Sequence, residues 1–166
     1  AEKKKRKTDY EVYTVNDQFY GTLANASGYY RGKKDHVDIY VPEKSQELVV
    51  TYVQEQRRTA TVFERDKAAS ANPYDVFFGG NHGLMQLDTA QSGKRLLVIK
   101  DSYANCFLPF LIPYYKSITV VDPRYYYDDL DKLIEEQGIQ EILFLYNANT
   151  FFSDDSLNEI LKKEVK

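Results

Sequence analysis

The second half of the chain contains three short apolar runs separated by segments of helical length. The runs are RLLVI at 95–99, ITVV at 118–121 and ILFL at 142–145. A continuous apolar run is typical of a strand that is buried on both faces of a sheet. Helices are predicted at 103–112, at 126–137 and after Ser153, which should cap the last one. Alternating strands and helices predict a parallel sheet with right-handed crossovers, an α/β core over residues 94–166.

The first half shows the shorter period of β-structure. Residues 10–15 alternate between apolar and polar, and Asn16 and Asp17 could cap a short helix that continues to about Ala24. A β-rich part is predicted over 37–88, because β-branched and aromatic residues dominate it. A first strand is expected to start at Val37. The segments 48–53 and 59–64 are expected to form a hairpin, and a last strand is expected at 84–88.

Polar side chains follow each of the three apolar runs. Lys100, Asp101 and Ser102 follow the first run, Asp122, Pro123 and Arg124 the second, and residues 146–149 (YNAN) the third. The carboxyl ends of parallel strands share one edge of a sheet, where sites of open α/β proteins gather. We therefore expect these side chains to converge.

Ser102 is placed as a nucleophile would be, on a turn between a buried strand and a helix. Its backbone N–H at a helix N-terminus could stabilise an oxyanion, and Asn147 or Asn149 could add a side-chain amide. Asp and Ser are also common helix caps, so capping alone is the other interpretation of this dipeptide.

A serine nucleophile needs a base, normally histidine. The chain contains two, His36 at a strand start and His82 in the glycine-rich turn GGNHG. Either could reach Ser102, although both also fit an ordinary surface or turn position. Cys106 is the single cysteine and is expected to be a small buried residue. No metal-ligand spacing or phosphate-binding loop is present, so no metal and no cofactor are predicted.

The composition restricts the partners. The 166 residues fit one domain, and a formal net charge of −3 gives no global attraction to nucleic acid or an anionic membrane. The basic run at 3–7 is interpreted as part of a linker over residues 1–9, with a single domain over 10–166. No apolar run approaches membrane-spanning length. The lone cysteine leaves the compartment open.

Several segments resemble one known family. The stretches FYGTL (19–23), YDVFFGGN (74–81), KDSYANCF (100–107), VDPRY (121–125) and NANTF (147–151) look like those of the DHHW family. These bacterial proteins are similar to the SGNH-like acetyltransferases of alginate acetylation systems. The resemblance implies a three-layer α/β/α SGNH-like (flavodoxin-like) fold with a parallel sheet core and an additional β-rich segment before it.

The resemblance also implies an activity and a site. Ser102 matches the nucleophile, with Asp101 and Asn147 or Asn149 as further catalytic residues, and Arg124, Asn81, His82 and Tyr103 are candidate substrate-binding residues. The Asp-His-His-Trp motif, which would precede Tyr10, is absent, and the chain has no Trp. The chain is therefore expected to resemble either the C-terminal part of a family member or a member that has lost its base, and as such a fragment it is expected to be inactive.

The implied function is a serine esterase or O-acyltransferase acting on O-acetyl groups of a cell-surface glycan. Its partners would be a surface polysaccharide or an acetyl donor, its location would be extracytoplasmic, and any membrane anchor would lie in a preceding segment. The alternative is a non-catalytic carbohydrate-binding module on the same fold. Its contact surface would be the tyrosines at 114–115 and 125–127.

Overall fold

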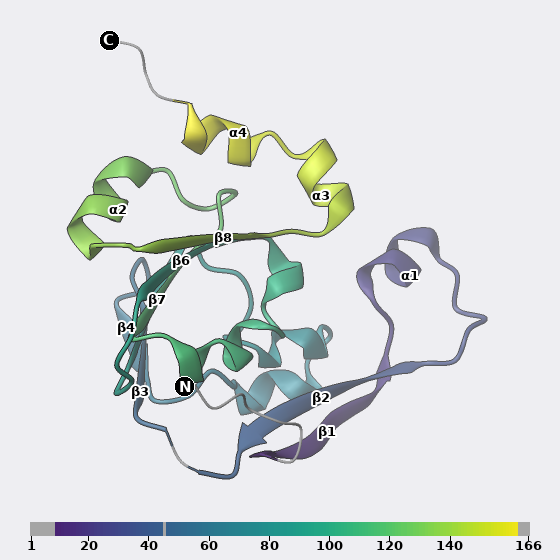
Figure 1. Ribbon diagram of the computed structural model, residues 1–166. Coiled ribbons are helices and arrows are strands. Elements are labelled where there is room, and N and C mark those ends of the chain that lie inside the picture. The colour runs from purple at the N-terminus through teal and green to yellow at the C-terminus, as the bar shows by residue number, and fades with distance from the viewer. Residues whose placement is uncertain (1–8, 45, 163–166) are drawn as a thin grey trace. The chain divides into compact units, whose positions relative to one another are not determined.

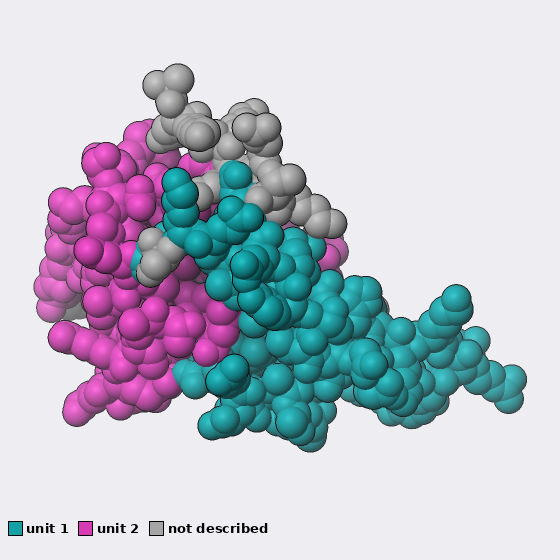
Figure 2. All heavy atoms as spheres, turned by 90° about the horizontal axis from the view of Figure 1, so that it is seen from below, with its two compact units in different colours: residues 1–46, 64–79 teal, residues 47–63, 80–166 magenta. Residues whose placement is uncertain are grey.

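The computed structural model describes residues 9–44 and 46–162. The chain divides into two compact units, coloured separately in Figure 2: residues 1–46 with 64–79, and residues 47–63 with 80–166. The basic run at 3–7 and the last four residues lie outside the described part. Among the described residues, no helix is both long enough and apolar enough to cross a membrane.

The first unit is built on a two-stranded antiparallel ribbon. β1 (Tyr10–Phe19) pairs with β2 (Asp35–Pro42), and α1 (Thr22–Ser27) lies in the connection between them. Two 3-10 turns, η2 (Arg65–Ala69) and η3 (Pro73–Val76), complete the unit. The strand predicted at 10–15 is confirmed but longer, so the helix begins at Thr22 and not at the predicted Asn16–Asp17 cap.

The second unit contains a mixed six-stranded sheet, in the described residues, with the order β4-β3-β5-β7-β6-β8. The three predicted apolar strands are confirmed as β6 (Arg95–Lys100), β7 (Ser117–Val121) and β8 (Glu141–Leu145), and they pair in parallel. The antiparallel strands β3 (Leu48–Tyr52), β4 (Arg57–Thr59) and β5 (Leu84–Thr89) extend this same sheet. The chain is therefore a mixed α/β protein.

One face of the sheet carries a hydrophobic core. Leu97 and Ile99 of β6 lie with Leu84, Val121, Tyr126, Leu130 and Leu133, and Ile134, Leu157 and Ile160 pack against them. The last six belong to or precede α2 (Leu130–Gln137) and α4 (Ser156–Leu161), so both helices cover this face (Figure 1). Because side chains alternate along a strand, Leu96, Val98 and Lys100 point to the opposite face.

Several predicted boundaries were wrong. The helix expected at 103–112 is a series of 3-10 turns, η4 (Ser102–Ala104), η5 (Leu108–Phe110) and η6 (Ile112–Tyr114), because Pro109 and Pro113 lack the N–H a longer helix needs. α2 starts at Leu130, where Asp129 caps it, and not at 126. Ser153 ends α3 (Ala148–Ser153) instead of capping the last helix. The second hairpin strand is 57–59, not 59–64.

Two burial predictions also differ from the structure. β8 was expected to be buried on both faces, but it is the last strand of the described sheet, and Ile142 and Phe144 are 48% and 47% exposed. Cys106 is exposed, not buried. The hydrophobic pattern of the sequence indicates that a strand is apolar, but the order of strands in the sheet decides which strand lies at the edge.

Candidate functional site

Asp101 joins the ends of two neighbouring strands. It follows β6 directly and is 2% exposed. Its Oδ1 accepts a hydrogen bond from the Tyr103 N–H (3.0 Å), and its Oδ2 accepts one from the Asn147 N–H (3.1 Å), just beyond β8. One buried carboxylate therefore fixes the Ser102 turn and the Asn147 turn relative to each other.

Ser102 lies at the elbow that sequence reasoning assigned to it. It is the first residue of η4, is half-buried, and its carbonyl accepts a hydrogen bond from the Asn105 N–H (3.2 Å). Tyr103, the next residue, is 62% exposed. The predicted helix dipole behind Ser102 is wrong, because a three-residue 3-10 turn aligns too few peptide dipoles to act as one.

Asn147 presents a side-chain donor. Its Oδ1 accepts a hydrogen bond from the Asn149 N–H (2.8 Å), which identifies the oxygen, because a backbone N–H can bond only to an acceptor. Among the described residues, the Nδ2 of Asn147 donates to no partner. Asn149 is exposed and meets Asn147 through its backbone. Of the two predicted asparagines, Asn147 is the one with a fixed amide.

Beside the elbow lies a buried charged pair. Lys100 and Asp122 are both 0% exposed, and the Lys100 Nζ donates to Asp122 Oδ2 (3.2 Å). Arg124 donates to the same carboxylate from Nε (2.9 Å) and from its terminal nitrogen (2.7 Å). Burial lowers the pKa of Lys100, and Asp122 opposes that shift. The hydrogen bonds to Asp122 raise the pKa of Arg124, so the guanidinium stays charged.

Asn81 connects the glycine-rich turn to this pair. Its Oδ1 accepts hydrogen bonds from Lys100 Nζ (3.1 Å) and from Asn105 Nδ2 (3.1 Å). Asn105 is 2% exposed and also donates to the Gly80 carbonyl (3.3 Å). Gly83 shows why the turn is glycine-rich, because a Cβ there would lie 2.2 Å from the Tyr125 carbonyl oxygen.

The two histidines have acidic neighbours. The Nδ1 of His82 lies 2.6 Å from Glu55 Oε1, and its ring packs edge-on against Tyr52 with the centroids 4.6 Å apart. Partial burial raises the pKa of Glu55, but the hydrogen bond to His82, a backbone hydrogen bond and the electrostatic effects of His82 and Arg57 together outweigh burial and lower this pKa below its usual value. His36 belongs to the first unit, where its Nε2 lies 3.2 Å from Asp38 Oδ2.

The sequence predicted that Lys100 and Asp122 lie at this edge of the sheet but gave them no role in the site, and it did not single out Asn105. Lys100 and Asp122 follow buried apolar strands directly, and that position was the available signal. Asn105 had no comparable signal, since it lies in a turn predicted as a helix. Within residues 9–44 and 46–162, no group of three or more His, Cys, Asp or Glu side chains could hold a metal ion.

Comparison with solved structures places this fold among known proteins. The chain is similar to a DHHW family protein from Eubacterium siraeum DSM 15702, with 26% identity and a TM-score of 0.79, over 96% of this chain and 55% of that one. It is also similar to Bacillus cereus PatB1 with a sulfonyl adduct, with 21% identity and a TM-score of 0.68, over 90% of this chain and 50% of that one. A second structure of PatB1 gives 20% identity and a TM-score of 0.66, over 90% and 52%.

The chain spans about half the length of these structures. No family model matches the sequence, and no curated protein matches it. The comparisons therefore give a structural neighbour in the DHHW family and a shared fold with PatB1.

Proposed function

We propose that this chain carries the nucleophile and one oxyanion donor of an SGNH-type serine esterase or O-acyltransferase with a three-layer α/β/α core. Ser102 is the nucleophile and Asn147 Nδ2 is the donor. The substrate class, O-acetyl groups of a cell-surface glycan, follows from the resemblance to the DHHW family. That resemblance also favours an extracytoplasmic location.

The observation that supports this function best is the bridging role of Asp101. Its carboxylate accepts hydrogen bonds from the N–H of Tyr103, the residue after Ser102, and from the N–H of Asn147, which follows Asp101 by 46 positions in the chain. Preorganised donors stabilise a transition state because they need no reorganisation during the reaction. Asp101 is therefore a positioning residue, with both oxygens engaged by backbone N–H groups.

The reaction assigns one task to each group. The Ser102 Oγ forms a bond to the ester carbonyl carbon while its proton passes to a base. The tetrahedral oxyanion accepts a hydrogen bond from Asn147 Nδ2. Collapse breaks the bond to the leaving alcohol, which takes a proton from the base, and leaves an acyl-serine. Water completes an esterase cycle, and a second alcohol completes a transferase cycle.

The base in this proposal is a histidine outside the two units. Nδ1 of His82 is engaged by Glu55, and its side chain is 11% exposed and packed on Tyr52. The resemblance to the DHHW family favours a histidine from another segment or a second chain. The sulfonyl adduct of PatB1 supports a nucleophile on this fold, because sulfonyl groups attach to activated nucleophiles.

Hydrolysis of an aryl acetate tests the assignment. Without a base the rate should be low, and added imidazole should raise it above the imidazole-only background. Ser102→Ala should abolish that increase, and His82→Gln should preserve it. Asn147→Ala should reduce the rate about 100- to 1,000-fold, whereas Asn149→Ala is the matched control and should change it little. An unchanged rate in Ser102→Ala would reject the nucleophile.

Exposed tyrosines next to the site support a second candidate, a carbohydrate-binding surface. Tyr127 is 86% exposed and Tyr125 is 49% exposed, with the Arg124 guanidinium 5.4 Å from the Tyr125 ring centroid. Tyr126 is 2% exposed and lies in the core, so its predicted place in the contact surface is wrong. A glycan titration of Tyr125→Ala and Tyr127→Ala tests this candidate, and unchanged affinity in both would exclude it.

A further inference from the structure

Asn81 reaches the same edge of the sheet as Ser102, from the side opposite to Asn147. The described sheet has β5, β7, β6 and β8 in that order. β5 is antiparallel to β7, with Leu84 opposite Val121, so the start of β5 lies where the parallel strands end. Asn81 precedes that start, Ser102 follows β6 and Asn147 follows β8. In the order of strands, the elbow therefore lies between two asparagines.

The side-chain amide of Asn81 has a fixed orientation. Its Oδ1 accepts hydrogen bonds from Lys100 Nζ (3.1 Å) and from Asn105 Nδ2 (3.1 Å). An ammonium group only donates, so the atom that faces Lys100 is the oxygen. The Nδ2 of Asn81 therefore faces away from the buried lysine, and within the described part of the chain it donates to no partner. Asn81 is exposed, so this donor is open to a ligand.

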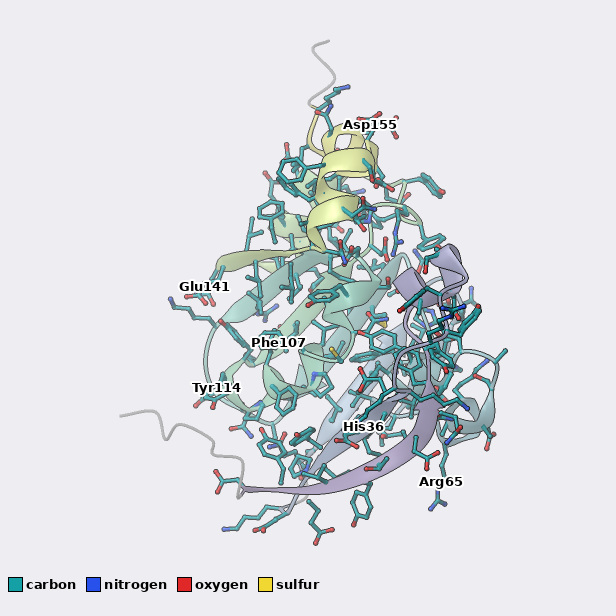
Figure 3. All side chains as sticks on the ribbon, turned by 90° about the vertical axis from the view of Figure 1, so that its right-hand side faces the viewer. His36, Arg65, Phe107, Tyr114, Glu141 and Asp155 are labelled. Atoms are coloured by element: carbon teal, nitrogen blue, oxygen red, sulfur yellow. The ribbon has the colours of Figure 1, made fainter. Side chains whose placement is uncertain are left out.

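The two groups that hold this amide lie on either side of the elbow. Lys100 comes two residues before Ser102 and is 0% exposed. Asn105 comes three residues after Ser102, and its N–H donates to the Ser102 carbonyl (3.2 Å). Phe107, labelled in Figure 3, is 46% exposed, whereas Asn105 is 2% exposed, so the asparagine side chain is directed inward. One oxygen of Asn81 therefore joins both ends of the elbow.

Asn105 holds Asn81 while its own oxygen stays without a partner. Its Nδ2 donates to the Gly80 carbonyl (3.3 Å) and to Asn81 Oδ1. Its Oδ1 is buried and has no hydrogen-bond partner among the residues that the structure describes. A buried polar atom without a partner is unfavourable, and burial of a charge such as that of Lys100 is also unfavourable. Proteins retain such groups mainly at functional sites, and here both of them bind the same amide.

We propose that Asn81 Nδ2 is a second donor to the oxyanion formed at Ser102. Lys100 and Asn105 are positioning residues that hold this donor, and the proposal rests on the nucleophilic role of Ser102. When the Ser102 Oγ bonds to the ester carbonyl carbon, an electron pair of the C=O bond moves to its oxygen. That oxygen accepts hydrogen bonds from Asn147 Nδ2 on one side and from Asn81 Nδ2 on the other. Asn81 gives up no proton, so the rest of the cycle is unchanged.

Imidazole-supported hydrolysis of an aryl acetate by the full 166-residue chain tests the donor. Asn81→Asp keeps an oxygen for Lys100 and Asn105 but replaces the donor with an acceptor, and Asn81→Ala removes the donor without adding a charge. Each variant should lower the rate about 100- to 1,000-fold. Asn149→Asp is the matched control, because it adds the same charge at an exposed asparagine that meets Asn147 only through its backbone. This control should change the rate little.

Lys100→Met tests the positioning role. Without the ammonium group the Asn81 amide is free to rotate, so labelling of Ser102 by phenylmethylsulfonyl fluoride in imidazole buffer should slow about tenfold. In Asn81→Ala the same substitution should change labelling by less than about twofold, because Lys100 acts through Asn81. A structural role of Lys100 alone would slow labelling equally in both backgrounds. Mass spectrometry restricts the readout to Ser102, and thermal melting followed by circular dichroism confirms that the variants are folded.

Three results would overturn the proposal and leave Ser102 as the nucleophile. The first is an unchanged rate in both Asn81 variants while Ser102→Ala abolishes hydrolysis. The second is an equal loss in Asn81→Asp and Asn149→Asp with no loss in Asn81→Ala, which would assign the effect to charge. The third is equal slowing by Lys100→Met with and without the Asn81 side chain. An unchanged rate in Ser102→Ala would instead reject the proposed function itself, and this inference with it.

Discussion

At the scale of single residues, the buried Lys100–Asp122 pair is the most consequential feature beside the elbow. Both side chains are 0% exposed, so each charge depends on the other for the solvation it has lost. Asp122 has a second cationic partner in Arg124, whereas the other acceptor of Lys100 Nζ is the neutral Asn81 oxygen. The two members of the pair are therefore not equivalent.

Replacing Asp122 should cost more stability than replacing Lys100. Asp122→Asn leaves a buried ammonium without a carboxylate and should lower the free energy of unfolding by about 3–5 kcal/mol. Lys100→Met leaves Asp122 paired with Arg124 and should lower it less. Urea unfolding measures both free energies, with the dependence of the free energy on urea concentration (the m-value) the same in both variants. A larger loss in Lys100→Met would contradict the asymmetry.

Sequence reasoning located the elbow because its residues follow apolar runs. Ser102, Arg124 and Asn147 were expected at one edge of the sheet for that reason, and the structure places each directly after its strand or one turn beyond it. Lys100 and Asp122 were expected at the same edge, but their complete burial was not predicted, because charged residues usually lie at the surface. Their burial depends on the register of β6 with β7, where Ile99 lies opposite Val121, and periodicity does not report register.

At the scale of elements, α2 shows how one side chain sets a boundary. The Asp129 carboxylate accepts a hydrogen bond from the Lys132 N–H (2.9 Å), and Gly138 ends the helix with φ +58°. A left-handed residue is a common helix end, and glycine adopts it without steric cost. The helix therefore occupies 130–137 and not the longer range that its apolar spacing suggested.

Removing the cap should weaken α2 and the core that it covers. Asp129→Ala should lower the free energy of unfolding by about 1 kcal/mol, because it leaves a helix N–H without its acceptor. Asp128→Ala is the matched control, since Asp128 is the neighbouring aspartate, is exposed and is not the cap. Equal losses in the two variants, measured by thermal or urea unfolding, would argue against capping.

The sequence predicted those helices and strands whose hydrophobic pattern is set by neighbouring residues. The parallel strands β6, β7 and β8 were predicted from their apolar runs. The turns at 102–114 were not, because an apolar stretch rich in Leu, Phe and Ile has the composition of a helix. The prolines at 109 and 113 prevent it from continuing as one.

At the scale of the whole molecule, stability should depend on pH through buried tyrosines of the second unit. Burial, followed by the negative charges of Asp128 and Asp129, raises the pKa of Tyr126 to about 12. An unfolded tyrosine loses its proton near pH 10. Between these values the folded chain holds a proton that the unfolded chain has released, so stability falls as pH rises.

Tyr126→Phe should reduce this alkaline loss. The urea midpoint of this variant should decline less steeply between about pH 10 and 12 than that of the unsubstituted chain. The midpoint can be lower at the start, because the variant lacks the hydrogen bond from Tyr126 to the Asp129 carbonyl. Tyr127→Phe is the control, because Tyr127 is 86% exposed. The lowered pKa of Lys100 makes stability rise with pH, opposite to the effect of Tyr126. Because Lys100 is present in all three proteins, its effect cancels in the comparison. Parallel pH profiles would contradict the assignment.

Strand order and the division into two units are properties of the whole molecule that local pattern could not supply. The apolar run at 142–145 looks like a fully buried strand, yet β8 lies at the edge of the described sheet. The β-rich part at 37–88 was expected before the core, and three of its strands joined the core sheet instead. These outcomes depend on pairings between residues far apart in sequence.

The central claim is that Ser102 is a nucleophile supported by Asn147, and covalent labelling tests it most directly. The chain would be treated with phenylmethylsulfonyl fluoride in imidazole buffer, and modified peptides mapped by mass spectrometry. We predict that Ser102 is labelled faster than the other serines, that Asn147→Ala slows this labelling, and that Asn149→Ala does not. Labelling of Ser102 no faster than that of exposed serines, or at the same rate in Asn147→Ala, would contradict the claim.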